Sequence, residues 1–238
     1  MRMGRPFRAP DSLTNHFQGL RPWLSWVAPS GLTLVATALT GANRPPMFFH
    51  LVVWLLVAGL LAASPFVPAA SRNTYITYGF AFIGFFLLTV TFVCGPLARR
   101  TGRPLYRHIL ARQRWLGIYS FLVVAAHVTC LWNFRYGWDV SKATGGLFKW
   151  VAFIALHGAF LILFAMFVTS NDAAVRALGA NWKRLHRLGL VAYALIAVGV
   201  LWASLKFAFL QPFFPVFLLL SLSVLFARLS ERKTNVHG

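Results

Sequence analysis

Six apolar stretches, each long enough to cross a lipid bilayer, limit what this chain can fold into. A helix that spans about 30 Å of hydrocarbon needs roughly 20 apolar residues, because it rises about 1.5 Å per residue. Of the whole chain, 58% is hydrophobic and only 11% is charged. The sequence therefore predicts an all-α integral membrane bundle of six transmembrane helices, at approximately Phe48–Pro68, Ile76–Ala98, Trp115–Phe134, Trp150–Ser170, Leu185–Leu205 and Pro212–Ala227.

A further apolar stretch, Trp23–Thr40, precedes these six and is interrupted by Pro29 and Gly31. It is either another span or a segment that is interfacial or re-entrant, and the charge pattern favours the second reading. We expect a basic, amphipathic N-terminal segment over residues 1–45, a membrane domain over 46–230 and a cytoplasmic tail over 231–238.

The chain carries 23 Lys and Arg against 4 Asp and Glu. Such an excess can indicate nucleic-acid binding, but here the cations lie between apolar runs, which is typical of the loops that orient membrane proteins. The richest segments follow the second and fourth predicted spans and the last one, so six spans place all three on one side. We therefore predict a multi-pass membrane protein, with both termini cytoplasmic, membrane lipid as a partner and no nucleic-acid partner.

The predicted spans contain no Asp or Glu, but they contain four histidines: His50, His127, His157 and His186. Ionisable residues inside a bilayer are costly and usually functional. Neutral imidazole is a common axial ligand of heme iron, and two histidines on facing helices can hold one heme. The alternative is that each histidine only forms a hydrogen bond to a neighbouring helix.

Depth supports a pair formed by His127 and His157, because each lies about 12 residues, or roughly 18 Å, from the same side of the membrane. His50 and His186 lie close to that side and form a second candidate pair. Gly117 lies on the same helical face as His127, as do Ser120 and Val124, so small side chains would leave a slot there for a flat macrocycle. Gly189 follows His186 by one turn and would leave a similar slot beside His186. A basic cluster that includes Arg112, Arg114 and Arg184 would form ion pairs with heme propionates or with anionic lipid.

The order and spacing of several short motifs resemble a known family. They begin with Gly-Pro-Leu-Ala-Arg at 95–99 and Arg-Gln-Arg-Trp-Leu-Gly-Ile-Tyr at 112–119, followed by His127. They continue with Thr-Ser at 169–170, Leu-Gly at 178–179, Trp-Lys-Arg-Leu-His at 182–186 and Trp202. Over roughly residues 75 to 230, the chain resembles the ferric-reductase-like transmembrane family. Within it, the likeness is to heme-binding membrane subunits of the periplasmic methionine sulfoxide reductase system (the MsrQ/YedZ type).

The resemblance implies b-type heme, a bacterial inner membrane, and electron flow from a quinol or a cytoplasmic donor to a periplasmic molybdopterin reductase. It also implies that His127 and His186 are ligands, with a second histidine thirteen residues after His186. This chain has Gly199 there, and glycine cannot bind iron. We therefore predict that His157 replaces the missing ligand and that the chain holds one heme b.

Three functions remain to be compared. The first is an electron-transfer subunit of an oxidoreductase system, with quinone as an additional cofactor and without a complete enzyme's activity. The second is a family member that has lost heme and acts as a membrane scaffold or assembly subunit, which Gly199 would allow. The third is a transporter, which the absence of intramembrane carboxylates and of midspan prolines disfavours.

Overall fold

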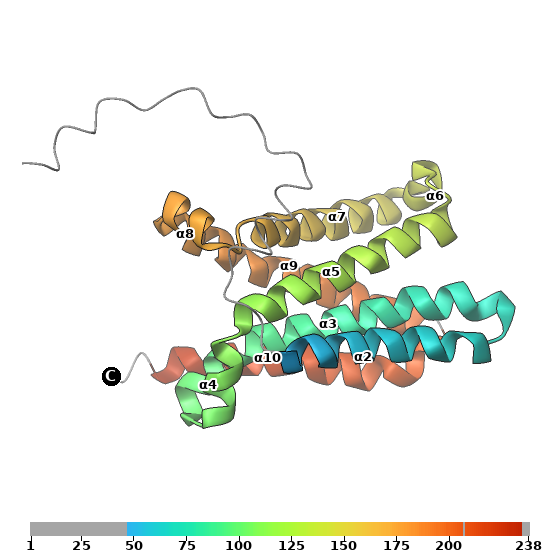
Figure 1. The fold of residues 1–238 in the computed structure, drawn as a ribbon. Coiled ribbons are helices and arrows are strands. Elements are labelled where there is room, and N and C mark those ends of the chain that lie inside the picture. Colours follow the sequence, from blue (N-terminus) through green and yellow to red (C-terminus); the bar gives the residue numbers. More distant parts are fainter. Residues whose placement is uncertain (1–46, 207, 235–238) are drawn as a thin grey trace, which may run out of the picture.

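The structure, a computed structural model, describes residues 47–206 and 208–234. Within these ranges every regular element is a helix (Figure 1). The predicted segment Trp23–Thr40 and the domain 1–45 lie outside the described residues. The elements are α2 (Met47–Ala63), η1 (Ser64–Phe66), α3 (Ala69–Thr101), α4 (Pro104–Leu110), α5 (Gln113–Leu131), η2 (Trp132–Tyr136), α6 (Val140–Thr144), α7 (Leu147–Val168), α8 (Asp172–Leu178), α9 (Ala180–Lys206), η3 (Ala208–Phe213) and α10 (Phe214–Thr234).

Six of these helical segments are long and apolar enough to cross a membrane, which confirms the predicted bundle. The boundaries differ from the prediction in an informative way. Helix α3 begins at Ala69, directly after its N-cap residue Pro68, so the polar residues up to Asn73 are helical. Helix α9 begins at Ala180, and it therefore contains Lys183 and Arg184, which the sequence placed in a loop. Polar residues extend both helices beyond their apolar sections.

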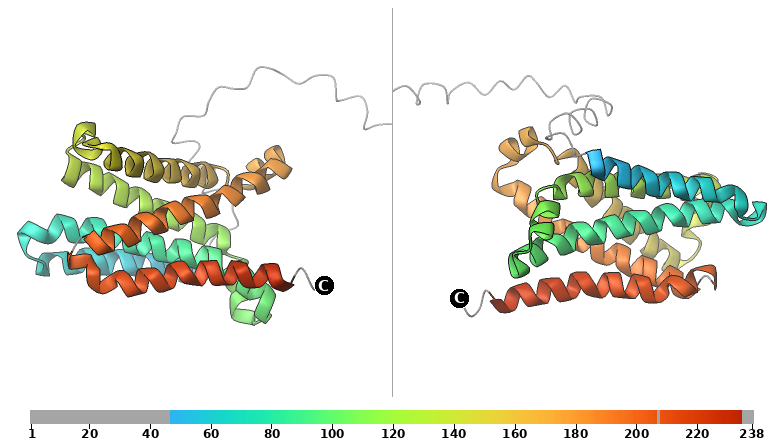
Figure 2. Two further views of the ribbon diagram at one scale, coloured as in Figure 1. Left: turned by 180° about the vertical axis from the view of Figure 1, so that it is seen from behind. Right: turned by 60° about the horizontal axis from the view of Figure 1, so that its bottom comes forward.

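The spanning helices form two tightly packed pairs. Helices α3 and α5 pack along much of their lengths, and so do α7 and α9, whereas the contacts of α5 with α7 and of α3 with α9 are sparse. Helix α10 lies against α3, and α2 lies on the outside of the bundle (Figure 1). Helix α9 crosses obliquely from α7 towards α10 (Figure 2).

The close approach of α3 and α5 depends on small residues. A Cβ built at Gly84 would lie 2.8 Å from Cγ2 of Val124 and 3.3 Å from its backbone nitrogen. The hydroxyl of Ser120, which is fully buried, donates a 3.0 Å hydrogen bond to the carbonyl oxygen of Gly84. In lipid, where apolar surface gives little drive for helix association, such close packing and interhelical hydrogen bonds hold a bundle together.

Short elements that the sequence did not predict close the two ends of the bundle. Helices α4 and α8 lie at the end where α10 finishes, and α6 lies at the other end (Figure 1). Gly102 ends α3 with a φ of 60°, in the left-handed region that glycine adopts readily. Helix α6 is capped by Asp139, and the hydrogen bonds that this carboxylate accepts from Ser141 lower its pKa below the ordinary value.

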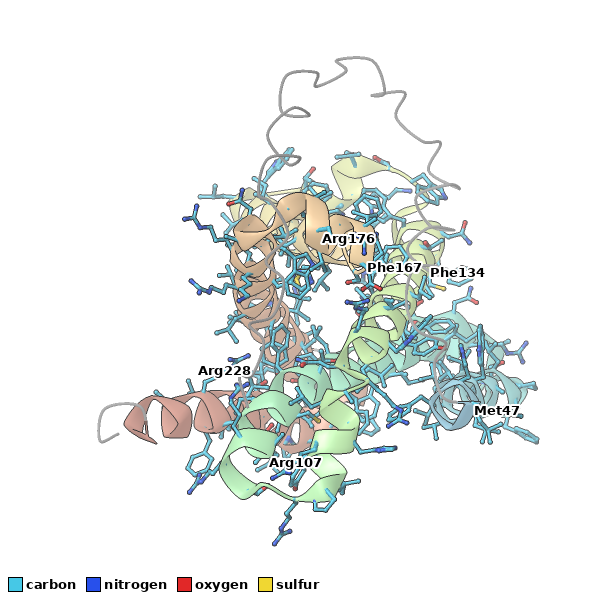
Figure 3. The ribbon with its side chains drawn as sticks, turned by 60° about the vertical axis from the view of Figure 1, so that its left-hand side comes forward. Met47, Arg107, Phe134, Phe167, Arg176 and Arg228 are labelled. Carbon is cyan, nitrogen blue, oxygen red and sulfur yellow. The ribbon has the colours of Figure 1, made fainter. Side chains whose placement is uncertain are left out.

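Positive charge is concentrated at the end that carries α4 and α8, which we call the basic end. Its cations include Arg99, Arg100, Arg103, Arg107, Arg112, Arg114, Arg176, Lys183, Arg184, Arg187 and Arg228. The opposite end has Arg72, Arg135, Lys142, Lys149 and Lys206. Figure 3 shows Arg107, Arg176 and Arg228 at the basic end, on three different helices.

The contact at Gly84 gives a test of the packing. Gly84→Leu would force a branched side chain against Val124 and its backbone, so we expect a loss of about 1–3 kcal/mol in the free energy of unfolding. The measurement is reversible unfolding in detergent, followed by loss of helical circular dichroism. Gly59→Leu is the matched control, because a Cβ at Gly59 has nothing within 4 Å. Equal destabilisation by both substitutions would contradict the importance of this contact.

Candidate functional site

His127 projects from α5 towards α3. Its Nδ1 lies 2.8 Å from the backbone carbonyl oxygen of Thr77. A carbonyl oxygen can only accept a hydrogen bond, so Nδ1 must carry the proton. In the neutral ring the other nitrogen, Nε2, then keeps its lone pair.

His157, on α7, has the same arrangement. Its Nδ1 donates to the carbonyl oxygen of Phe153, one turn earlier, over 2.8 Å. Its Nε2 accepts a 3.3 Å hydrogen bond from the indole N–H of Trp132, which begins the π-helix η2 after α5. The ring also lies against Phe153, with ring centroids 4.0 Å apart. The lone pair of His157 is therefore on Nε2, where it accepts the hydrogen bond from Trp132 in the π-helix that follows α5.

His186 lies near the start of α9. Its Nδ1 donates over 3.1 Å to the carbonyl oxygen of Trp182, and the two rings stack with centroids 3.9 Å apart. The indole N–H of Trp182 donates to the carbonyl oxygen of Thr169, which ties the start of α9 to the end of α7. His186 is thus held on a fixed support, and its Nε2 also keeps the lone pair.

These three histidines share one tautomer and one hydrogen-bond arrangement. In each, Nδ1–H donates to a backbone carbonyl oxygen and Nε2 carries no proton. This is the arrangement in which imidazole binds a metal, because the outer hydrogen bond fixes the ring orientation and raises its basicity. His50 differs, because its ring nitrogens face the hydroxyl of Tyr119 on α5, beside Trp115. His50 therefore joins α2 to α5 through a side-chain contact.

The helices place the three prepared histidines at two depths. His127 is 14 residues after the start of α5 and His157 is 11 residues before the end of α7, or roughly 21 and 17 Å from the basic end. His186 is only 6 residues after the start of α9, or roughly 9 Å from that end. Depth therefore groups His127 with His157 and separates His186 from both.

The glycines named from the sequence have different surroundings. A Cβ at Gly117 would have nothing within 4 Å, so there is open space beside this residue. A Cβ at Gly189 would lie 2.7 Å from Sδ of Met166, so that side chain fills the predicted slot beside His186. A Cβ at Gly199 would lie 2.8 Å from Cδ2 of Leu156.

Two of the small residues predicted to leave a slot beside His127 are used in packing against α3, the helix towards which His127 also projects. Ser120 donates to Gly84 and Val124 packs on it, as described above. The position of the family's second histidine on α9, Gly199, is likewise packed against α7. Open space on the predicted face therefore remains at Gly117 alone.

Arg112 and Arg114 already contact protein groups. Arg112 donates to the carbonyl oxygen of His108 over 3.2 Å. Arg114 forms an ion pair with Asp172 on α8, with N and O atoms 2.6 Å apart. The side chain of Arg184 is exposed on α9. All three lie at the basic end: Arg112 directly precedes α5, and Arg114 and Arg184 lie near the starts of α5 and α9.

Trp132 was not identified from the sequence as a residue of the site. Its indole contacts His157 and stacks on Trp138, and only the π-helix at the end of α5 directs it there. Trp132 follows His127 by five residues, and this spacing was the available signal that both lie near one site. It becomes informative only once α5 and α7 are known to be neighbours. Within residues 47–206 and 208–234, no three His, Cys, Asp or Glu side chains cluster as a metal site, and Cys94 and Cys130 are free thiols.

The fold defines a multi-pass membrane protein, and three of the histidines in its spanning helices share one hydrogen-bond arrangement. Residues 80–197, about half of the chain, match the family model described as ferric reductase like transmembrane component, so this part of the chain is similar to that family. The matched region contains His127, His157 and His186 and ends before Gly199.

A curated relative extends this likeness. The chain is 31% identical over 158 residues to the protein-methionine-sulfoxide reductase heme-binding subunit MsrQ of Azospira oryzae. The alignment covers 64% of this chain and 61% of that relative, so the chain spans about three fifths of the relative's length. No solved structure shows a significant match.

The hydrogen bond between Trp132 and His157 can be tested by stability. Trp132→Phe removes the indole donor but keeps an aromatic ring, and we expect it to lower the free energy of unfolding by about 1 kcal/mol. Thermal unfolding of the heme-free protein in detergent measures this loss. Trp138→Phe is the matched control, because Trp138 stacks on Trp132 but is largely exposed. If the two variants unfold alike, the hydrogen bond contributes nothing to stability.

Proposed function

We propose that this chain is a heme-binding membrane subunit that carries electrons across a bacterial inner membrane to a periplasmic reductase. The observation that carries the proposal is the shared state of His127, His157 and His186, whose Nε2 atoms keep their lone pairs inside the membrane. The name of the relative from Azospira oryzae, a heme-binding subunit, supports it.

His127 and His157 would hold one b-type heme, because they lie at similar depth on α5 and α7. Bound heme iron supplies one-electron redox chemistry that the side chains of this chain do not offer. His127 is held for this role by Thr77. His157 becomes available when the indole of Trp132 releases its Nε2, and the bond to Phe153 keeps the ring oriented.

The remaining candidate residues are assigned by position. Gly117 lies on α5 with open space beside it and leaves room for the edge of a macrocycle. Arg112, Arg114 and Arg184 lie nearer the basic end and would pair with propionates there. His186, with Gly189 one turn later, and His50 mark a second position close to the basic end, where Met166 now fills the space beside Gly189.

The direction of electron flow follows from charge. The basic end is the proposed cytoplasmic side, because loops rich in Arg and Lys remain there. A quinol or a cytoplasmic protein would supply electrons at this end, and a molybdopterin-dependent methionine sulfoxide reductase would receive them at the opposite end. The chain would then act as one subunit of an oxidoreductase system.

A difference spectrum between the oxidised and reduced protein, together with a pyridine hemochrome assay, tests the proposal. We expect a low-spin b-type spectrum and about one heme per chain. In His127→Ala and in His157→Ala, we expect heme content to fall at least about fivefold, because one of the two histidines that would hold the heme is lost. His108→Ala is the control, since His108 is exposed on α4 outside the spans.

Each other outcome has a definite meaning. Unchanged heme in His157→Ala with loss in His186→Ala would transfer the second ligand role to His186. A folded preparation without heme would overturn the proposal and leave the scaffold function in its place.

Restoring the family's missing histidine gives a second test. Gly199→His alone would meet Leu156, so we expect little change in heme content or a less stable protein. Gly199→His combined with Leu156→Ala makes room for the imidazole, and we expect heme content or heme retention to rise above that of the single variant. Leu156→Ala alone is the control. The same heme content in all three variants would show that position 199 does not reach the heme.

A further inference from the structure

The connection between α3 and α5 gathers arginines at the basic end. Arg100 lies in the last turn of α3, Arg103 precedes the first residue of α4, and Arg107 lies in the last turn of α4. All three side chains are exposed. No Asp or Glu occurs between residues 99 and 114, so no acidic residue of this segment neutralises them.

Apolar surface lies directly beside these cations. Leu105, in the first turn of α4, is 63% exposed between Arg103 and Arg107. The guanidinium of Arg100 lies over the ring of Phe226 on α10, 6.0 Å from its centroid, and Phe226 is 68% exposed. Phe226 belongs to the span Leu210–Leu229, so Arg100 lies where the hydrocarbon-facing surface of α10 ends. Charged heads above apolar stems are typical of the boundary between lipid and water.

We propose that Arg100, Arg103, Leu105 and Arg107, which we call the α4 surface, bind an anionic phospholipid. The three guanidinium groups offer several N–H donors to the phosphate of the headgroup. Leu105 and Phe226 contact the start of the acyl chains. An anionic phospholipid matches both the arginines and the apolar side chains beside them. A soluble anion would bind the arginines but leave the exposed apolar side chains uncovered.

The other basic corner of the same end provides a comparison within the molecule. Arg176 on α8 and Lys183 and Arg187 on α9 are also exposed. This corner includes Asp172, which pairs with Arg114, so its field is partly neutralised. Removing the same number of positive charges at this corner therefore distinguishes a defined lipid site on α4 from a general effect of net charge.

The experiment is native mass spectrometry of the full chain in detergent, with added dioleoylphosphatidylglycerol or dioleoylphosphatidylcholine. We expect the wild-type protein to retain the anionic lipid and to lose the zwitterionic one at the same collision energy. We expect the variant Arg100→Gln/Arg103→Gln/Arg107→Gln to retain at least about fivefold less phosphatidylglycerol. The control Arg176→Gln/Lys183→Gln/Arg187→Gln should change retention by less than about twofold.

Equal losses in the two triple variants would overturn the site, because net charge alone would explain the binding. Unchanged retention in the α4 variant would also overturn it. If inorganic phosphate at equal concentration displaces the lipid, the surface binds soluble anions and the lipid assignment is wrong. Helical circular dichroism checks folding. If the triple variant does not fold, Arg103→Gln and Arg107→Gln are measured singly, and wild-type retention in both would overturn the proposal.

Discussion

Helix α3 is the element against which the rest of the bundle is built, and its contact with α5 at Gly84 sets how closely the helices approach. Glycine there lets the backbone of α5 come within a distance that a Cβ would prevent, and Ser120 crosses the same contact with a buried hydrogen bond. On its other sides α3 meets α10 and, through a stack of Phe85 on Tyr193, α9. Since lipid provides little hydrophobic drive between helices, these polar and close contacts decide the arrangement.

Backbone carbonyl oxygens prepare the histidines of the bundle. Thr77, Phe153 and Trp182 each accept from the Nδ1 of one histidine, two of them within a single helical turn and one across helices. A backbone oxygen cannot be exchanged by substitution and cannot donate, so the tautomer is set by the fold itself. The proposed heme binding would therefore use ring orientations that the protein already holds.

Charge divides the molecule along its length. The opposite end has few cations and presents aromatic residues such as Trp138, whereas the basic end combines arginines with short helices that lie across the ends of the spans. The same asymmetry supports the proposed membrane orientation and the lipid-binding α4 surface. The proposed electron path and the α4 surface remain distinct, because the former depends on groups between helices and the latter on groups outside them.

The sequence by itself determined the six spans, the sidedness of charge and the four histidines within the spans, because apolar length, loop charge and intramembrane imidazole are local properties of the chain. It also identified Gly199 as a departure from the family. Only the tertiary structure decided which groups meet. It showed that Ser120 and Val124 face α3, that Leu156 fills the space at Gly199, and that the indole of Trp132 engages His157. These contacts depend on how each helix is rotated about its own axis and on the π-helix after α5. That rotation is fixed only when two helices pack together, so the sequence pattern of either helix alone does not contain it.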